Sequence, residues 1–479
     1  MSSSQSHFIL PAGWHLEHSY AQLPHSFHVQ IEPTLVREPK MVVLNRPLAL
    51  SLGLDADLLA DAALFAGNEL PPGSAPLAQA YAGHQYGHFT TLGDGRAILL
   101  GEQITPRGER FDIQLKASGP TPFSRRGDGR AALGPMLREY IISEAMHALG
   151  IPTTRSLAVV TTGEKIFRQE MQPGAVLTRI AASHIRVGTF EYAAASGDET
   201  QLRALADYTM RRHYPDVLGA DQPFLGFFEA VMERQAALIA KWQHVGFIHG
   251  VMNTDNMALS GETIDYGPCA FMDVYDPDTV FSSIDRNGRY SYGNQPHIAK
   301  WNLARLAEAL LPLFHKDEKQ SLMIANEAIA SFEERFKRHW LAGMRSKLGL
   351  FTAESGDAAL IQSLLDRLHD TKADYTNTFR DLTQGRIVSP EWHPSWTARL
   401  KQQPQSPSEV TDMMRRHNPA FIPRNHKVEE ALAAASSQGD LNPMNRLLTV
   451  LADPFDHAQD WPEFSQPSEA ESYQTFCGT

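Results

Sequence analysis

The hydrophobic periodicity changes along this chain, and that change constrains the fold more than any other feature. Before residue 181, short runs such as 96–100 and 111–116 have the character of β-strands, and one clear helix is predicted over 133–149. Beyond residue 181, stretches with helical spacing follow one another, at 200–212, 224–245, 298–314, 321–348 and 428–435. Strands first and helices second predict an α+β protein.

Length and composition suggest several parts with a site between them. The chain has 479 residues, which is too many for one compact core, and its 42% hydrophobic and 20% charged residues are typical of a folded protein. We expect an N-terminal extension over 1–80 with helical spacing at 48–64, a strand-rich lobe over 81–180, a helical lobe over 181–453, and an irregular tail over 454–479.

Charge and cysteine usage exclude several classes of partner. The net charge of -12 argues against nucleic acid, because phosphate backbones attract a surplus of Lys and Arg. No apolar stretch reaches the roughly 18 residues that a membrane span needs, and the N-terminus lacks a secretory signal pattern. Cys269 and Cys477 are the only cysteines, too few for a disulfide framework or a cysteine-based zinc site. We therefore expect a cytoplasmic protein, and a monomer.

The most specific pattern is GFIHGVMNTDNM, followed shortly by IDYG. Protein-kinase catalytic loops contain His-x-Asp, an Asn five residues after that Asp, and a later Asp-Phe-Gly whose Asp binds metal. His249 and Asn256 keep this spacing, and Asp265 begins an Asp-Tyr-Gly. The position of the kinase base is Val251, which cannot accept a proton. Asp255, beside Asn256, is the nearest replacement carboxylate.

Other residues upstream would suit a polyphosphate. Gly93 and Gly95 flank an Asp before a strand, so backbone N–H groups can approach phosphate oxygens there, although Gly-Asp-Gly is also a common hairpin turn. The loop at 124–130 (SRRGDGR) joins arginine donors with glycines, and is alternatively an exposed basic turn. Arg179 and Arg186 lie in stretches of sequence that are otherwise apolar. Burying an unpaired charge there is costly, so we expect both arginines to face an anion.

Lys116 ends the strand-like run at 111–116. An ammonium group in this position can pair with nucleotide phosphates while a carboxylate from the next helix holds it. Glu139 and Glu144 are both candidates for that carboxylate, and periodicity does not choose between them.

The chain resembles the selenoprotein O family, also called the YdiU family, of kinase-like protein adenylyltransferases. The resemblance covers nearly the whole chain. It is carried by residues 82–87 (AGHQYG), 92–96 (LGDGR), 124–130 (SRRGDGR), 249–256 (HGVMNTDN), 266–273 (YGPCAFMD) and 418–426 (NPAFIPRNH). It implies a protein-kinase-like bilobal fold with N- and C-terminal extensions, and transfer of AMP from ATP to Ser, Thr or Tyr hydroxyl groups of proteins. ATP would lie flipped relative to ordinary kinases, so that its α-phosphate meets the acceptor.

The resemblance also implies a role for individual residues. Asp255 would be the proton acceptor, Glu139 would orient Lys116, and Asn256 with Asp265 would bind Mg²⁺ or Mn²⁺. The nucleotide would be held by Gly93, Gly95, Arg96, Lys116, Asp128, Gly129, Arg179, Arg186 and Asp265.

Other functions stay open beside AMP transfer. Transfer of UMP from UTP, auto-modification and a role in the redox stress response are implied by the resemblance. An ordinary phosphotransferase is a second candidate, and Val251 argues against it. A non-catalytic pseudokinase scaffold is a third, and the intact Lys116, Asn256 and Asp265 argue against that.

The two cysteines lead to one further expectation. Cys269 lies four residues after Asp265, and Cys477 lies near the C-terminus, where the family pattern also has a cysteine or selenocysteine. We expect an intramolecular disulfide between them under oxidising conditions, which would restrain the tail near the active site.

Overall fold

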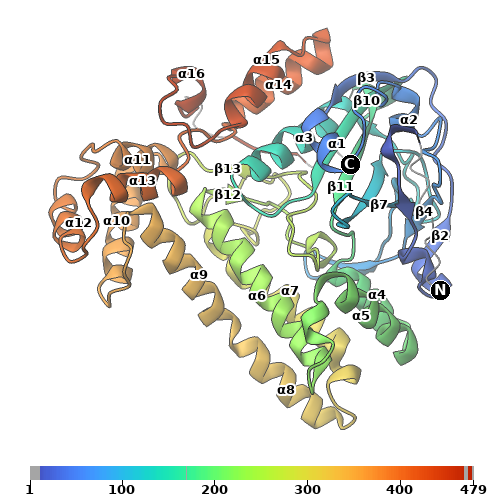
Figure 1. Cartoon of the computed structure of the whole chain (residues 1–479), viewed down its shortest axis with the longest axis horizontal. Helices are drawn as coiled ribbons and strands as arrows, with labels where there is room; N and C mark the ends of the chain where they lie inside the picture. The colour runs from blue at the N-terminus through green and yellow to red at the C-terminus, as the bar shows by residue number, and fades with distance from the viewer. Residues whose placement is uncertain (1–10, 169, 469–472, 477–479) are drawn as a thin grey trace, which may run out of the picture.

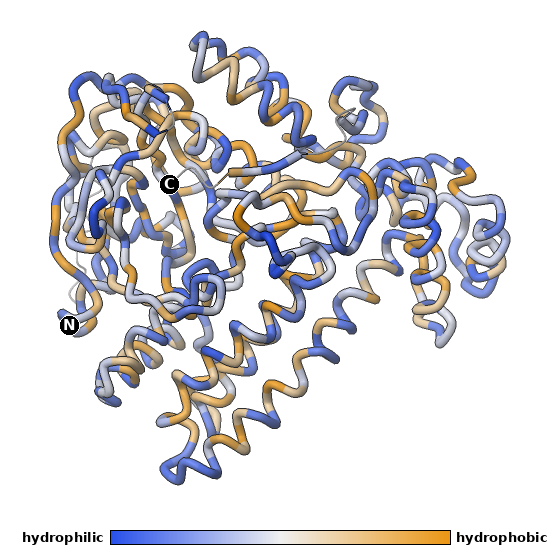
Figure 2. Tube along the Cα trace, turned by 180° about the vertical axis from the view of Figure 1, so that it is seen from behind, coloured by the Kyte–Doolittle hydropathy of each residue, from blue (hydrophilic) through white to orange (hydrophobic). Residues whose placement is uncertain are grey.

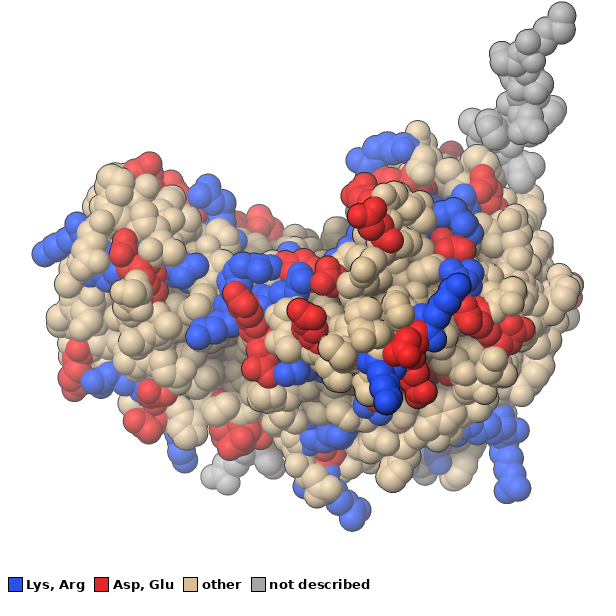
Figure 3. All heavy atoms as spheres, turned by 90° about the horizontal axis from the view of Figure 1, so that it is seen from below, with Lys and Arg blue, Asp and Glu red and all other residues tan. Residues whose placement is uncertain are grey.

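The computed structural model describes residues 11–168, 170–468 and 473–476. It confirms the predicted α+β class, because an antiparallel sheet in the first part of the chain is followed by a largely helical part (Figure 1). Among the described helices, none is long and apolar enough to cross a membrane. Acidic and basic side chains are interspersed over the face of the molecule seen in Figure 3.

The large sheet has nine antiparallel strands, seven of them in the order β2-β4-β7-β8-β11-β10-β3, with β1 paired to β7 and β9 to β11. Its strands are β1 (Leu16–Glu17), β2 (His28–Gln30), β3 (Lys40–Leu44), β4 (Leu77–Gln79), β7 (Ala97–Ile104), β8 (Arg110–Lys116), β9 (Ala131–Ala132), β10 (Arg155–Phe167) and β11 (Met171–Ala181). The first 80 residues thus supply four strands of the same sheet as the later ones. Two small hairpin-like pairs are β5 (Ala82–Gln85) with β6 (His88–Thr91) and β12 (Phe247–Ile248) with β13 (Ala270–Phe271).

Helices pack on both faces of the large sheet, and successive side chains along each strand point to opposite faces. On β7, Ile98 and Leu100 join a core with the first two helices, α1 (Arg46–Ser51) and α2 (Ala62–Ala66). Leu99, between them, belongs to the other core, which contains α3 (Leu133–Ala148). The strand predicted at 96–100 therefore divides its apolar side chains between two cores.

The helical part contains thirteen further helices among the described residues. They are α4 (Val187–Ala195), α5 (Glu199–His213), α6 (Pro223–His244), α7 (Gln295–Phe314), α8 (Glu318–Ala330), α9 (Phe332–Lys347), α10 (Asp357–Thr371), α11 (Tyr375–Thr383), α12 (His393–Leu400), α13 (Pro407–His417), α14 (Asn425–Gln438), α15 (Asn442–Leu451) and α16 (Pro462–Ser465). Figure 1 shows α6, α7 and α9 running side by side, with α10–α13 gathered at one end. Along the long helices hydrophilic and hydrophobic segments alternate every few residues (Figure 2), as amphipathic helices require.

Two expected helices and the expected tail are corrected by the structure. The stretch 48–64 is not one helix, because α1 ends before Gly53, which has a positive φ of 79°, and Asp61 caps a separate α2. The stretch 321–348 is divided at Ser331, whose hydroxyl donates to the backbone carbonyl of Ala328 and so competes with the helical pattern. The tail contains the short helix α16.

Candidate active site

A central cavity of about 360 Å³ gathers nearly all of the residues singled out in the sequence. It lies between strands β7, β8 and β11 and the loop that follows β12. Its walls include Gly93, Gly95, Arg96, Lys116, Asp128, Gly129, Arg179, Arg186, Asp255, Asn256 and Asp265. Glu139 lies behind this wall. The volume is within the range of cavities that bind small molecules.

Lys116 is held by two carboxylates at the end of β8. Its Nζ lies 2.6 Å from Glu139 Oε2 and 2.5 Å from Asp265 Oδ1. Arg179 comes from the neighbouring strand β11 and contacts the same two acids, at 2.7 Å and 3.5 Å. Two cations and two anions therefore form one cluster at the base of the cavity.

The structure distinguishes the two carboxylates of α3. Glu144 pairs with Arg155, to which it is joined by hydrogen bonds of 2.7 Å and 2.5 Å. Glu139 is buried, and although burial alone would raise its pKa, the charges of Arg179 and Lys116 lower it. Glu139 is therefore an anion that holds Lys116 and Arg179 in place.

Asp265 has the same electrostatic support and an uncommon backbone conformation. Its φ of 68° lies in the left-handed region, where residues other than Gly are uncommon. Burial would raise the pKa of its carboxyl, but Lys116 and Arg179 hold that pKa well below its usual value. About a third of the side chain is exposed to the cavity, so an ionised carboxylate faces any ligand there.

The Gly-Asp-Gly turn is a loop between β6 and β7, and not the turn of a two-residue hairpin. Gly93 has a positive φ, and a Cβ added there would lie 2.4 Å from the ring of Phe123. Asp94, which also lines the cavity, accepts hydrogen bonds from the backbone N–H of Gln79 (3.1 Å) and the side chain of Gln114 (3.2 Å). These two hydrogen bonds anchor the loop, and Gly93 and Gly95 line the cavity on either side of Asp94.

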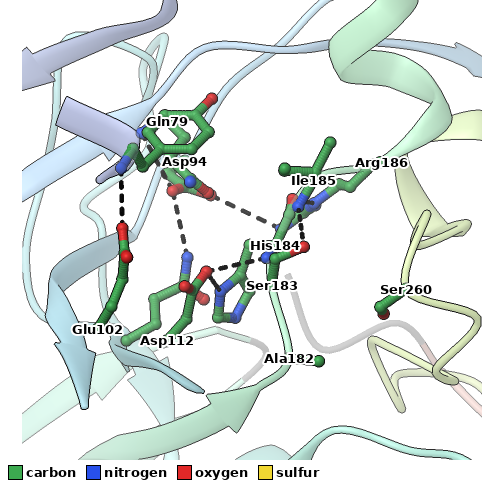
Figure 4. A network of polar contacts seen from close by, with 12 residues as sticks. Gln79, Asp94, Glu102, Asp112, Ala182, Ser183, His184, Ile185, Arg186 and Ser260 are labelled. Atoms are coloured by element: carbon green, nitrogen blue, oxygen red, sulfur yellow. Dashed lines mark hydrogen bonds and ion pairs between the residues drawn. The ribbon is translucent and has the colours of Figure 1, made fainter. Parts of the chain in front are cut away.

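Arg186 is the N-cap residue of α4 and lies under the same loop. Its guanidinium is 3.7 Å from Asp94 Oδ1, donates to the backbone carbonyl of Asp255 (3.1 Å) and stacks on the ring of Tyr81 at 4.2 Å. Its Nε donates to the carbonyl of His184 (3.3 Å), and His184 in turn donates to Asp112 through both its backbone N–H and its ring (Figure 4). A buried polar network therefore fixes the position of this cation.

The loop at 124–130 closes one side of the cavity. Asp128 forms a two-pronged ion pair with Arg168, with distances of 2.8 Å and 2.9 Å, and this pairing lowers the pKa of Asp128. Gly129 has a positive φ, and a Cβ there would meet the backbone of Gly119 at 2.1 Å. Only glycine fits this approach.

The catalytic-loop motif folds as a set of mutual restraints. His249 Nε2 donates to the carbonyl of Ile264, one residue before Asp265, and burial lowers the pKa of this ring. Val251, at the position of a kinase base, uses its backbone carbonyl to accept a hydrogen bond of 3.0 Å from Asn256 Nδ2. The amide nitrogen of Asn256 is thereby engaged, whereas its amide oxygen accepts no hydrogen bond from the part of the chain that the structure describes.

Asp255 supplies a buried carboxylate to the cavity. Its Oδ1 is buried and has no hydrogen-bond partner among the described residues. Burial raises the pKa of Asp255 to about 6, with the charge of Arg186 opposing the rise. Hairpin β5–β6 covers this carboxylate so closely that a Cβ on Gly83 would lie 2.2 Å from Oδ1. The arrangement suits a group that accepts a proton.

The donor set also fits a divalent cation. Within the described residues, no group of three or more His, Cys, Asp or Glu side chains could hold a metal by itself. Mg²⁺, however, is commonly bound by one or two protein oxygens together with substrate phosphates and water. The ionised carboxylate of Asp265 and the amide oxygen of Asn256, both in the wall of the central cavity, match this requirement.

Some residues of the site carried little signal in the sequence. Tyr81 and Arg168 line the cavity but lie outside the motifs noted in the sequence, and Gln85 lies in the motif at 82–87, which indicated no role for it. Arg168 is near the tip of the β10–β11 hairpin, and only the fold brings it to Asp128. The proposed partner of Cys269, Cys477, lies outside the described residues, so the disulfide stays a prediction.

Cys269 itself is buried, and burial raises the pKa of its thiol to about 12. The described part of the tail approaches Cys269. The hydroxyl of Thr475 donates a hydrogen bond to the carbonyl of Pro268 (2.7 Å), the residue directly before Cys269.

Comparisons with known proteins agree on one family. The family model described as "Protein adenylyltransferase SelO" matches residues 13–452. The protein nucleotidyltransferases YdiU of Brevibacillus brevis and Halalkalibacterium halodurans are each 60% identical to this chain, over 98% of both chains in each case. A YdiU protein of Bacillus cereus is 59% identical over 98% of this chain and 99% of its own. The chain therefore belongs to the SelO family of protein adenylyltransferases, as the sequence motifs indicated.

Proposed function

We propose that this enzyme transfers AMP from ATP to Ser, Thr or Tyr hydroxyl groups of proteins. One observation carries the proposal: a single cavity is lined both by the cations Arg96, Lys116, Arg179 and Arg186 and by the buried carboxylate of Asp255. The cations suit a polyphosphate, and the carboxylate suits the proton of an attacking hydroxyl.

The reaction follows from these groups. The hydroxyl oxygen of the acceptor attacks the α-phosphorus of ATP, the bond from that phosphorus to the bridging oxygen breaks, and pyrophosphate leaves. The hydroxyl proton passes to Asp255, whose raised pKa of about 6 suits transient protonation near neutral pH. Lys116 and Arg179, each held by Glu139, stabilise the charge of the phosphates.

A divalent cation, Mg²⁺ or Mn²⁺, would be held by Asn256 and Asp265 and would offset negative charge on the phosphate oxygens. We also infer a protein-kinase-like arrangement of the two parts of the chain. The strand-borne Lys116 with its helix-borne Glu139, and the loop that carries His249 and Asn256, support it. Val251 in the place of the kinase base favours attack at the α-phosphate over phosphotransfer.

The products test the proposal. Incubation with ATP, Mg²⁺ or Mn²⁺ and acceptor protein should release pyrophosphate in proportion to the protein modified. Release of ADP in that proportion would instead establish a phosphotransferase, and absence of turnover in a protein that binds ATP would establish a non-catalytic scaffold. The same assay with UTP measures which nucleotide is the better donor.

A further inference from the structure

A second hollow of about 490 Å³ lies beside the central cavity. We call it the side cavity, and its walls include Tyr86, Ile284, Arg286, Arg289 and Asn294. The two cavities share the hairpin β5–β6 and its turn, because Gln85 lines the central cavity while its neighbour Tyr86 lines the side cavity. A ligand that spans both would cross this hairpin.

The side cavity is attached to the catalytic loop. Asn253, two residues before Asp255, accepts two hydrogen bonds at its side-chain oxygen. One comes from the backbone N–H of Tyr86 (3.1 Å) and the other from the hydroxyl of Tyr290 (2.6 Å). Asn253 therefore positions both the β5–β6 hairpin and the turn at 284–290, and it lies two residues before Asp255, the proposed proton acceptor.

The charge of the side cavity is positive. Its walls hold two arginines against one carboxylate, that of Asp285, whose oxygens accept hydrogen bonds from the backbone N–H groups of Arg289 (2.9 Å) and Tyr290 (2.7 Å). Arg286 is exposed, and Arg289 has a buried Nε without a hydrogen-bond partner. Within residues 11–168, 170–468 and 473–476, neither arginine forms an ion pair. Two guanidinium groups are thus available to an anion.

Arg289 is held ready for such a ligand. Its guanidinium stacks on the ring of Trp301 in α7 at 4.8 Å, and its backbone carbonyl accepts a hydrogen bond of 2.6 Å from Asn294 Nδ2. A planar guanidinium fixed in this way loses little freedom when it binds a carboxylate with two hydrogen bonds.

We propose that the side cavity binds the acceptor protein next to its modified hydroxyl, and selects acceptors with an acidic side chain flanking that hydroxyl. The carboxylate of this flanking Asp or Glu pairs with Arg286 and Arg289, while the exposed Ile284 contacts an adjoining apolar side chain. This inference rests on the proposed function, and it names the class of acceptor.

The test uses three synthetic peptides that share the same core, which contains a Ser, a Thr and a Tyr as acceptors. The peptides differ only in the residues that flank this core, which are acidic in the first peptide, neutral in the second and basic in the third. Transfer of label from α-labelled ATP and binding of each fluorescent peptide are measured with the full chain, with Arg286→Glu and with Arg289→Gln. Arg416→Glu, at an exposed position in α13, is the matched control.

We expect the unmodified chain to prefer the acidic peptide by about tenfold in kcat/KM over the neutral one. Arg289→Gln should remove that preference, Arg286→Glu should shift it towards the basic peptide, and the control should keep it. Equal transfer to all three peptides, an unchanged preference in both variants, or no binding of the acidic peptide would overturn the inference. Binding of the acidic peptide without α-label transfer to any acceptor would instead refute the proposed function.

Discussion

Replacing Gly83 by Ala tests whether the position of Asp255 governs turnover. Gly83 lies in β5, and its backbone is not in the left-handed region, so Ala can adopt its conformation. The added Cβ would lie 2.2 Å from Asp255 Oδ1, whereas ordinary contact begins near 3.4 Å. The carboxylate must therefore move by about 1 Å, since the atoms of the hairpin are tied to the catalytic loop by the hydrogen bond from His84 N–H to Thr254 (2.6 Å).

The size of the effect follows from this displacement. A shift of about 1 Å at a reacting group costs on the order of 10²-fold in rate, and overpacking costs about 1–3 kcal/mol of stability. We therefore expect Gly83→Ala to lower kcat for AMP transfer by about 10²-fold while the Kd for ATP changes little, because Lys116 and Arg179 are untouched.

The assay compares kcat, the Kd for ATP and the thermal midpoint Tm of Gly83→Ala with those of Gly219→Ala. Gly219 is the matched control, because no atom lies within 4 Å of its added Cβ. A Gly83→Ala protein that is folded, binds ATP and keeps the kcat of the unmodified chain would refute the placement of Asp255 as proton acceptor.

Three further outcomes are expected. Asp265→Ala should abolish both AMP transfer and metal-dependent ATP binding. Asp255→Ala should lower kcat by about 10²–10⁴-fold and keep ATP binding. If both variants lost ATP binding equally, Asp255 would be a metal ligand. Glu139→Ala should lower the free energy of unfolding by about 3 kcal/mol in denaturant titrations, since it leaves two buried cations, Lys116 and Arg179, to share the carboxylate of Asp265. Burial lowers the pKa of Lys347 to about 7, so the unfolded chain binds more protons between about pH 7 and 10. Stability should rise over that window, and Lys347→Met should remove the rise.

The sequence predicted the parts of the site that lie in short motifs. The strands at 96–100 and 111–116 are predicted from a short apolar run and an alternating run, and one end of each strand, at Ala97 and Lys116, lines the central cavity. Periodicity could not decide whether Glu139 or Glu144 pairs with Lys116, because both lie on α3. Only the fold shows that Glu144 pairs with Arg155 instead.

Contacts between distant segments were not predictable. Gly83 belongs to a motif noted in the sequence, but nothing local indicates that it covers Asp255. Arg168 reaches Asp128 only because the β10–β11 hairpin folds over the loop at 124–130. The break at Ser331 was missed because apolar spacing continues on both sides of it.

The central claim is that the α-phosphate, and not the γ-phosphate, is transferred. The most direct measurement incubates the full chain and acceptor protein with Mg²⁺ or Mn²⁺ and ATP labelled at one phosphate or the other, and counts label on protein after pyrophosphate and free nucleotide are removed. Because Val251 leaves no base at the kinase position and Asp255 lines the cavity, we expect label from α-labelled ATP and none from γ-labelled ATP. Label from γ-labelled ATP alone would contradict the account.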